Sequence, residues 1–145
     1  MTRVEAPIDI DAPPPRVWGI LIDFPAYGEW NPVITEMIGR PQLGARVVLR
    51  VHLPGTRERI VRLAVTHVEP DRELAWAGRL GLPRLFDAEH RLRIERRDDG
   101  RSHFVQSAEF RGVLVPLFRR IRSKVAPGLV DLNRALKARA EAALN

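Results

Sequence analysis

The feature that most constrains this chain is a regular alternation of apolar and polar residues that returns in one short segment after another. It is clearest in residues 46–53, where Val47, Leu49, Val51 and Leu53 share one parity and the polar Arg46, Arg50 and His52 share the other. Successive side chains of a strand point to opposite faces, so this period of two predicts half-buried strands. The same pattern recurs in 61–66, 74–76, 86–95 and 104–110. Turn sequences rich in Gly, Pro and Asp separate these segments, which predicts an antiparallel meander.

Two short helices are expected between a first strand and this meander. Residues 4–10 alternate like the later strands, and prolines then follow at 13–15. Proline is tolerated in the first turn of a helix, so 13–23 is predicted as a short amphipathic helix capped by Asp11 or Ala12. A single further turn is expected in 26–30.

The spacing of apolar residues changes after Gly112. They recur there at threes and fours, which predicts one amphipathic helix of about 28 residues, kinked at Pro127. The order of elements predicts an α+β fold in which a curved antiparallel sheet of about seven strands wraps around a long C-terminal helix. A chain of 145 residues is expected to form a single domain, residues 1–145.

Composition narrows the classes of protein. Hydrophobic residues make up 45% of the chain, yet no apolar run reaches the roughly 18 residues that a membrane span requires. No signal-peptide pattern opens the sequence, so we expect a cytoplasmic protein. The absence of Cys excludes thiol catalysis and thiolate metal sites.

The chain is basic, with a net charge of +6 and Arg in place of nearly every Lys. Only residues 119–124 form a basic cluster; elsewhere Asp and Glu lie among the Arg residues, so we do not expect nucleic-acid binding. An apolar stripe beside the cluster, in 114–125, suggests transient contact with a membrane surface; the alternative is an ordinary helix start packed on the sheet. The sequence predicts no oligomeric state.

Five pieces in order resemble the START-like superfamily, also called SRPBCC, with its helix-grip, birch-pollen-allergen-like fold. They are APPPRVWGILIDFPAYGEWNP at 12–32, ELAWAGRL at 73–80, FDAEHRLRIE at 86–95, HFVQSAEFRGVLVPL at 103–117 and GLVDLNRALKARAE at 128–141. Within the superfamily the chain is similar to the bacterial polyketide cyclase/dehydrase group. The resemblance implies a deep apolar cavity between the curved sheet and the long helix.

Inward parity and helical spacing then select the side chains expected to meet a ligand in such a cavity. They are Trp30, Trp76, Phe86, His90, Phe104, Gln106, Phe110, Ile121, Val125 and Leu129. Tyr27 and Trp30 are expected to close one end of the sheet, with Asn31 bonding the backbone before Pro32.

His90 is the candidate catalytic residue, because an imidazole on the cavity face can act as general acid or base near neutral pH. Gln106 shares the inner face and would orient the ring or bind a ligand oxygen. The alternative is a hydrogen-bonded core histidine.

Glu89, Arg91 and Glu109 have outward parity, and no local motif pairs carboxylates or aligns Ser, His and Asp. His52, His67 and His103 lie on separate strands, so we expect neither a metal site nor a cofactor.

These observations favour binding or transport of a small hydrophobic molecule of lipid, polyketide or aromatic type. One alternative is an enzyme of the polyketide cyclase or aromatase type that uses His90 as acid and base. A further alternative is an interaction protein whose Arg-rich surface meets an anionic partner.

Overall fold

The computed structural model describes residues 2–79, 87–112 and 115–142, except for the side chains of residues 117, 118 and 121. Seven strands in this range form one antiparallel sheet in the order β1-β7-β6-β5-β4-β3-β2. They are β1 (Thr2–Ile10), β2 (Ile34–Ile38), β3 (Arg46–Val51), β4 (Arg59–Glu69), β5 (Glu73–Arg79), β6 (Asp87–Arg96) and β7 (Ser102–Arg111). Strands β2 to β7 each pair with the next, which confirms the predicted meander, and β1 closes against β7.

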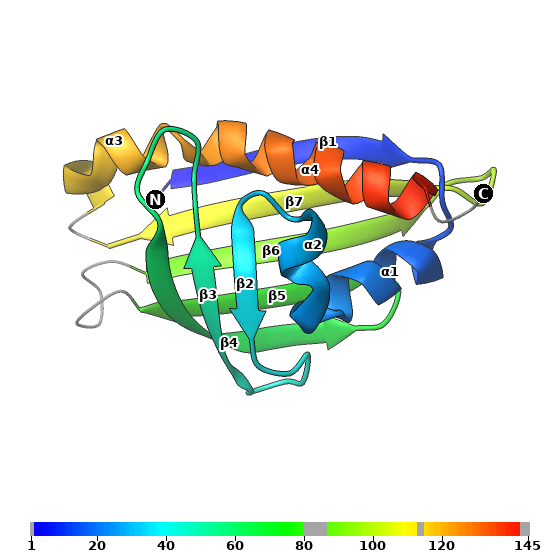
Figure 1. The fold of residues 1–145 in the computed structure, drawn as a ribbon, viewed down its shortest axis with the longest axis horizontal. Coiled ribbons are helices and arrows are strands. Elements are labelled where there is room, and N and C mark those ends of the chain that lie inside the picture. The colour runs from blue at the N-terminus through cyan, green and yellow to red at the C-terminus, as the bar shows by residue number, and fades with distance from the viewer. Residues whose placement is uncertain (1, 80–86, 113–114, 143–145) are drawn as a thin grey trace.

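The sheet curls around helix α4 (Val125–Ala142), as the helix-grip prediction requires. Figure 1 shows α4 running along β1 and β7, with the short N-terminal helices beside it. The apolar stripe of α4, Leu132, Leu136 and Ala140, is buried in the main core. Alternate residues of the strands, such as Leu49 of β3 and Leu92 of β6, meet that stripe from the concave face of the sheet.

Helix α1 (Pro14–Ile22) forms where the prolines and the apolar spacing predicted it. The predicted cap was wrong, because Pro13 occupies the N-cap position and makes no side-chain capping bond. Pro14 and Pro15 then take the first helical positions, where a missing N–H breaks no helical hydrogen bond. Val17 and Leu21 carry the buried face of the helix.

The stretch after α1 forms a tight corner made of the 3-10 helix η1 (Phe24–Ala26) and helix α2 (Tyr27–Trp30). The Tyr27 hydroxyl donates to the Leu21 carbonyl at 2.5 Å. The Asn31 carbonyl oxygen Oδ1 accepts from the backbone N–H of Val33 at 3.0 Å and of Ile34 at 2.8 Å. The sequence predicted that Asn31 would bond the backbone before Pro32. Asn31 instead accepts from backbone N–H groups that follow Pro32.

The C-terminal region corrects the prediction of one long kinked helix. The chain forms the 3-10 helix η2 (Val115–Phe118), then α3 (Arg119–Arg122), and only then α4. Pro127 lies in the first turn of α4, and the first bond across that turn runs from the Gly128 N–H to the Lys124 carbonyl at 3.1 Å. Proline therefore starts a helix here instead of kinking one, because the N–H groups of a first turn have no helical partner.

Candidate ligand-binding site

His90 lies on the concave face of β6, as its parity predicted, and stays partly exposed. Trp76 of β5 is its direct cross-strand partner. The two rings meet edge to face, with centroids 5.2 Å apart and an interplanar angle of 73°. Phe24 of the corner segment also meets the Trp76 ring edge to face, with centroids 6.2 Å apart. The imidazole is thus held in an aromatic wall.

A chain of polar side chains runs from His90 of β6 to β1, the nearer edge strand of the sheet. His90 Nε2 lies 2.8 Å from Gln106 Oε1. Gln106 Nε2 donates to the Leu129 carbonyl at 2.8 Å and to Asn133 Oδ1 at 2.6 Å. Asn133 Nδ2 donates in turn to the Ala6 carbonyl at 3.1 Å. The chain therefore ties β6, β7, α4 and β1 together inside the molecule.

Burial lowers the pKa of His90 below its ordinary value of 6.5, because a charged imidazole is poorly solvated there. The hydrogen bond to Gln106 opposes this effect in part. His90 is therefore neutral at neutral pH and retains a nitrogen that can accept a proton.

A narrow void, too small to hold a water molecule, lies between the helices and the concave face of the sheet. Its walls come from α1, the corner, the sheet and α4: Leu21, Tyr27, Trp30, Asn31, Ile34, Trp76, His90, Leu92 and Leu132. Ligand pockets for drug-sized molecules measure about 300–1,000 Å³. The enclosed space is thus smaller than the deep cavity that the resemblance implied.

The wall of this void contains buried N–H donors that have no partner among the described residues. They are Trp30 Nε1, Asn31 Nδ2 and Trp76 Nε1. The orientation of the Asn31 amide is fixed, because its oxygen accepts two backbone N–H groups. A buried donor without an acceptor costs about 1–3 kcal/mol, so each of these groups would be stabilised by an acceptor atom placed beside it.

A second, smaller apolar cluster lies next to the polar chain. Ala6, Ala108, Val125 and Leu129 form it, and the partly buried side chains of Leu53 and Phe110 pack against it. Three of the predicted ligand residues, Phe110, Val125 and Leu129, belong here.

The predicted site residues thus fall into separate places. Trp30, Trp76 and His90 border the void, and Gln106 holds His90. Phe104 is fully buried in the main core. Phe86 and the side chain of Ile121 lie outside the described residues. The sequence analysis did not single out Asn133, although its position four residues after Leu129 places it on the buried face of α4.

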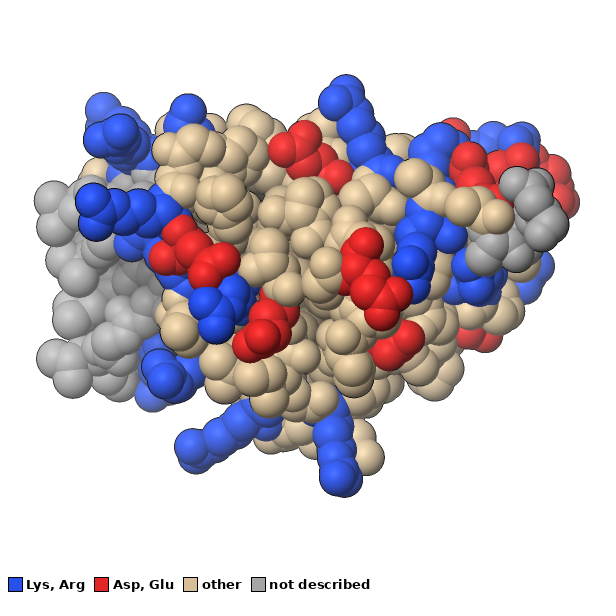
Figure 2. All heavy atoms as spheres, in the orientation of Figure 1, with Lys and Arg blue, Asp and Glu red and all other residues tan. Residues whose placement is uncertain are grey.

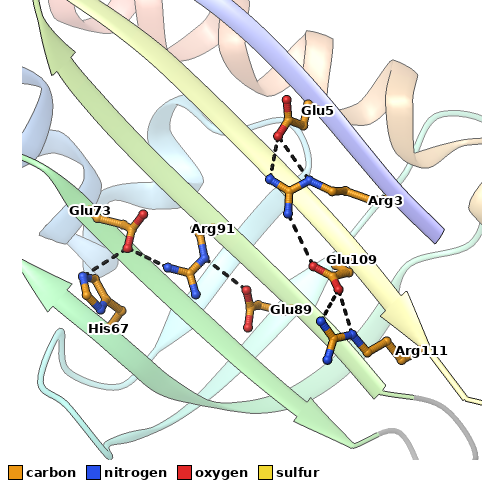
Figure 3. A network of polar contacts seen from close by, with 8 residues as sticks. All are labelled: Arg3, Glu5, His67, Glu73, Glu89, Arg91, Glu109 and Arg111. Atoms are coloured by element: carbon orange, nitrogen blue, oxygen red, sulfur yellow. Dashed lines mark hydrogen bonds and ion pairs between the residues drawn. The ribbon is translucent and has the colours of Figure 1, made fainter. Parts of the chain in front are cut away.

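Charged residues occupy the opposite, convex face of the sheet. Figure 3 shows two groups of ion pairs there: Glu5, Arg3, Glu109 and Arg111 in one, and His67, Glu73, Arg91 and Glu89 in the other. Arg91 Nη1 lies 2.6 Å from Glu73 Oε2, and Arg3 Nη1 lies 3.4 Å from Glu109 Oε2. The outward orientation predicted for Glu89, Arg91 and Glu109 is confirmed. Partly exposed pairs of this kind contribute little to stability.

The face shown in Figure 2 carries charges of both signs around a largely uncharged middle.

Within residues 2–79, 87–112 and 115–142, no cluster of His, Asp or Glu has the arrangement of a metal site. His103 pairs instead with Asp9, Nδ1 to Oδ1, at 2.7 Å. None of the described helices combines the length and the apolar character needed to cross a membrane.

Comparison with protein families decides the kind of protein. Residues 1–141 match the family described as polyketide cyclase / dehydrase and lipid transport. The chain belongs to this family. No curated protein matched the sequence.

Solved structures show that this member of the family shares its fold with distant proteins. One is the Zhui aromatase/cyclase from Streptomyces sp. R1128, with 18% identity, a TM-score of 0.82, and coverage of 99% of this chain and 96% of that one. A START superfamily protein from Mycobacterium smegmatis has 21% identity and a TM-score of 0.74, covering 96% and 97%. Ara h 8.0201 has 14% identity and a TM-score of 0.72, covering 97% and 98%. Identities this low show the fold alone; the START-like assignment is confirmed by the family match over residues 1–141 together with this shared fold.

Proposed function

We propose that this protein binds or carries a small hydrophobic molecule between α4 and the concave face of the sheet. The observation that supports this most directly is the wall of the void, which combines apolar and aromatic side chains with unpartnered N–H donors. Binding sites for small molecules typically have an apolar lining with a few placed polar groups. The side chains of the wall would have to move apart to admit a ligand, and an oxygen of that ligand would then supply the acceptor that the indole of Trp76 lacks.

The ligand is proposed to extend beyond the void, toward the second apolar cluster. Leu53 and Phe110 are only partly buried there, next to Val125 and Leu129. Each CH₂ group of a ligand buried against such side chains is worth about 0.8 kcal/mol, so micromolar affinity (about −8 kcal/mol) requires only a modest apolar molecule. The family includes lipid transport in its description, which agrees with this use of the interior.

The binding test uses a fluorescent naphthyl ketone, which offers a flat apolar body and one acceptor oxygen. Trp76→Phe keeps a ring in the wall and removes the N–H donor, so we expect the dissociation constant to rise by about threefold to tenfold. Trp18→Phe is the matched control, since Trp18 is also a buried indole but does not border the void. Saturable binding that Trp76→Phe leaves unchanged would contradict the assigned place, and no binding by the wild type would contradict the function.

Catalysis of the cyclase or aromatase type is the second candidate, favoured by a neutral His90 in an aromatic wall. In such a reaction the imidazole takes a proton from the carbon next to a ketone, giving an enolate that attacks a second carbonyl. The imidazolium then returns the proton to the new alkoxide, which becomes a hydroxyl. In a second round the imidazole takes another proton from the carbon next to the ketone and delivers it to that hydroxyl, which leaves as water while the C=C bond forms. His90→Ala is expected to abolish turnover of a poly-ketone substrate but to leave its binding largely intact. Turnover that survives this change would rule out the catalytic role.

A further inference from the structure

The two carboxamides beside His90 can take only one orientation each. The backbone carbonyls of Leu129 and Ala6 accept hydrogen bonds and cannot donate them. The Gln106 group 2.8 Å from the Leu129 carbonyl must therefore be its NH₂. The Asn133 group 3.1 Å from the Ala6 carbonyl must likewise be NH₂, which turns Asn133 Oδ1 toward Gln106.

This orientation decides which nitrogen of His90 carries hydrogen. Gln106 presents its oxygen to His90 Nε2 at 2.8 Å, and an oxygen of this kind can only accept. Nε2 must therefore be protonated. In a neutral imidazole the other nitrogen, Nδ1, then holds the lone pair. The hydrogen bond found for the His90 ring among the described residues is made by Nε2 and leaves Nδ1 without one.

The surroundings leave Nδ1 as the atom that a ligand would meet. Tyr27 is the one other ionisable residue on the wall of the void, as far as the described residues show, and its hydroxyl already donates to the Leu21 carbonyl. The wall otherwise offers N–H donors from Trp30, Asn31 and Trp76, which cannot accept a proton. Nδ1 is thus the acceptor nitrogen in a wall of donors.

We infer that Gln106 and Asn133 are positioning residues that hold His90 as the Nε2–H tautomer, so that Nδ1 accepts a hydrogen bond from a hydroxyl, phenol or enol group of the ligand. The part of this inference that concerns the ligand rests on the proposed function. The part that concerns the tautomer does not. A proton that arrives at Nδ1 leaves the Nε2–H bond to Gln106 in place. The same arrangement therefore serves binding of a hydroxylated molecule and proton transfer to and from it.

Nuclear magnetic resonance of protein labelled with ¹⁵N in histidine tests the tautomer without any ligand. At about pH 7.5, above the pKa of a free imidazole, His90 should show a pyridine-type Nδ1 and a pyrrole-type Nε2, with its signals assigned through His90→Phe. Gln106→Leu should give a mixture of tautomers, and Asn133→Leu a smaller shift in the same direction. Gln106→Glu keeps an acceptor oxygen opposite Nε2, so Nε2 should stay protonated in this variant. A wild-type His90 that is mostly Nδ1–H overturns the inference, even if no variant folds.

The ligand half is tested with naphthol and methoxynaphthalene, which share a ring system but differ in the O–H donor. Naphthol should bind about threefold to tenfold more tightly and shift the Nδ1 resonance, while methoxynaphthalene should bind without that shift. Equal affinities with an unmoved Nδ1 resonance would overturn the ligand half and leave hydrophobic binding intact. Failure of both probes to bind would overturn the ligand half together with the proposed function.

Discussion

Gln106 of β7 joins the sheet to the C-terminal helix, because its carboxamide donates to the Leu129 carbonyl of α4 at 2.8 Å. The side chain is fully buried, and its other contacts are with His90 and Asn133. A single residue thus connects the candidate base, the helix and the sheet.

Replacing Gln106 with Leu should destabilise the protein by about 2–4 kcal/mol, because the Leu129 carbonyl and the Asn133 amide lose their buried partner. Urea unfolding followed by circular dichroism would measure the change. Gln42→Leu is the matched control: Gln42 is exposed, so the same substitution should change the free energy of unfolding by less than about 0.5 kcal/mol. Equal effects of the two variants would show that the buried chain adds no stability.

His90 should make the protein less stable as the pH falls below 6.5. Its pKa is lowered by burial, so the unfolded chain binds the proton more readily than the folded protein does. The stability that depends on a neutral His90 is fully present above pH 6.5 and is lost as the pH falls through the pKa of His90 in the folded protein. The free energy of unfolding changes by at most about 1.4 kcal/mol per pH unit through this effect. Unfolding free energies at about pH 7.5 and 5.5 would show a smaller difference in His90→Gln than in the wild type.

The control for this pH prediction is His52→Gln, which makes the same substitution at an exposed position. It should keep the wild-type pH dependence. If His90→Gln also kept it, the imidazole would not be neutralised by burial, and the acid–base role would lose its basis.

Two helical glycines should respond to alanine with opposite signs. A Cβ at Gly28 would lie 2.9 Å from the Thr35 carbonyl oxygen, so Gly28→Ala must push α2 away from β2 and should cost about 1–3 kcal/mol. Nothing lies within 4 Å of a Cβ at Gly19 in α1, so Gly19→Ala should stabilise by about 0.5–1 kcal/mol. Thermal unfolding of both variants checks the prediction, and a neutral Gly28→Ala would mean that the corner is loosely packed.

Pro127→Ala should change stability by less than about 1 kcal/mol, because Pro127 occupies the first turn of α4. If the region were one long helix kinked at Pro127, the same substitution would stabilise it by about 3 kcal/mol. Ala135→Pro, in the middle of α4, provides the contrast and should cost about 3 kcal/mol or more. Denaturant unfolding of the two variants separates these outcomes.

The sequence by itself determined the strands, their inward faces and the order of the elements. Alternation is a local property of the chain, so the inward placement of Trp76, His90 and Gln106 followed directly from parity. The same parity placed Glu89 and Arg91 outside, where the structure has them. Apolar spacing also predicted the core stripe of α4.

Tertiary structure alone decided where the last helix begins, how small the void is, and what His90 contacts. The start of α4 depends on a break at residues 123–124 that apolar spacing does not reveal. The size of the void depends on how side chains from α1, the corner, the sheet and α4 fill one space. The bonds from Gln106 to Leu129 and Asn133 join residues 23 and 27 positions apart. A periodic pattern assigns each side chain to a face, but only packing brings distant faces together and fixes which atoms meet.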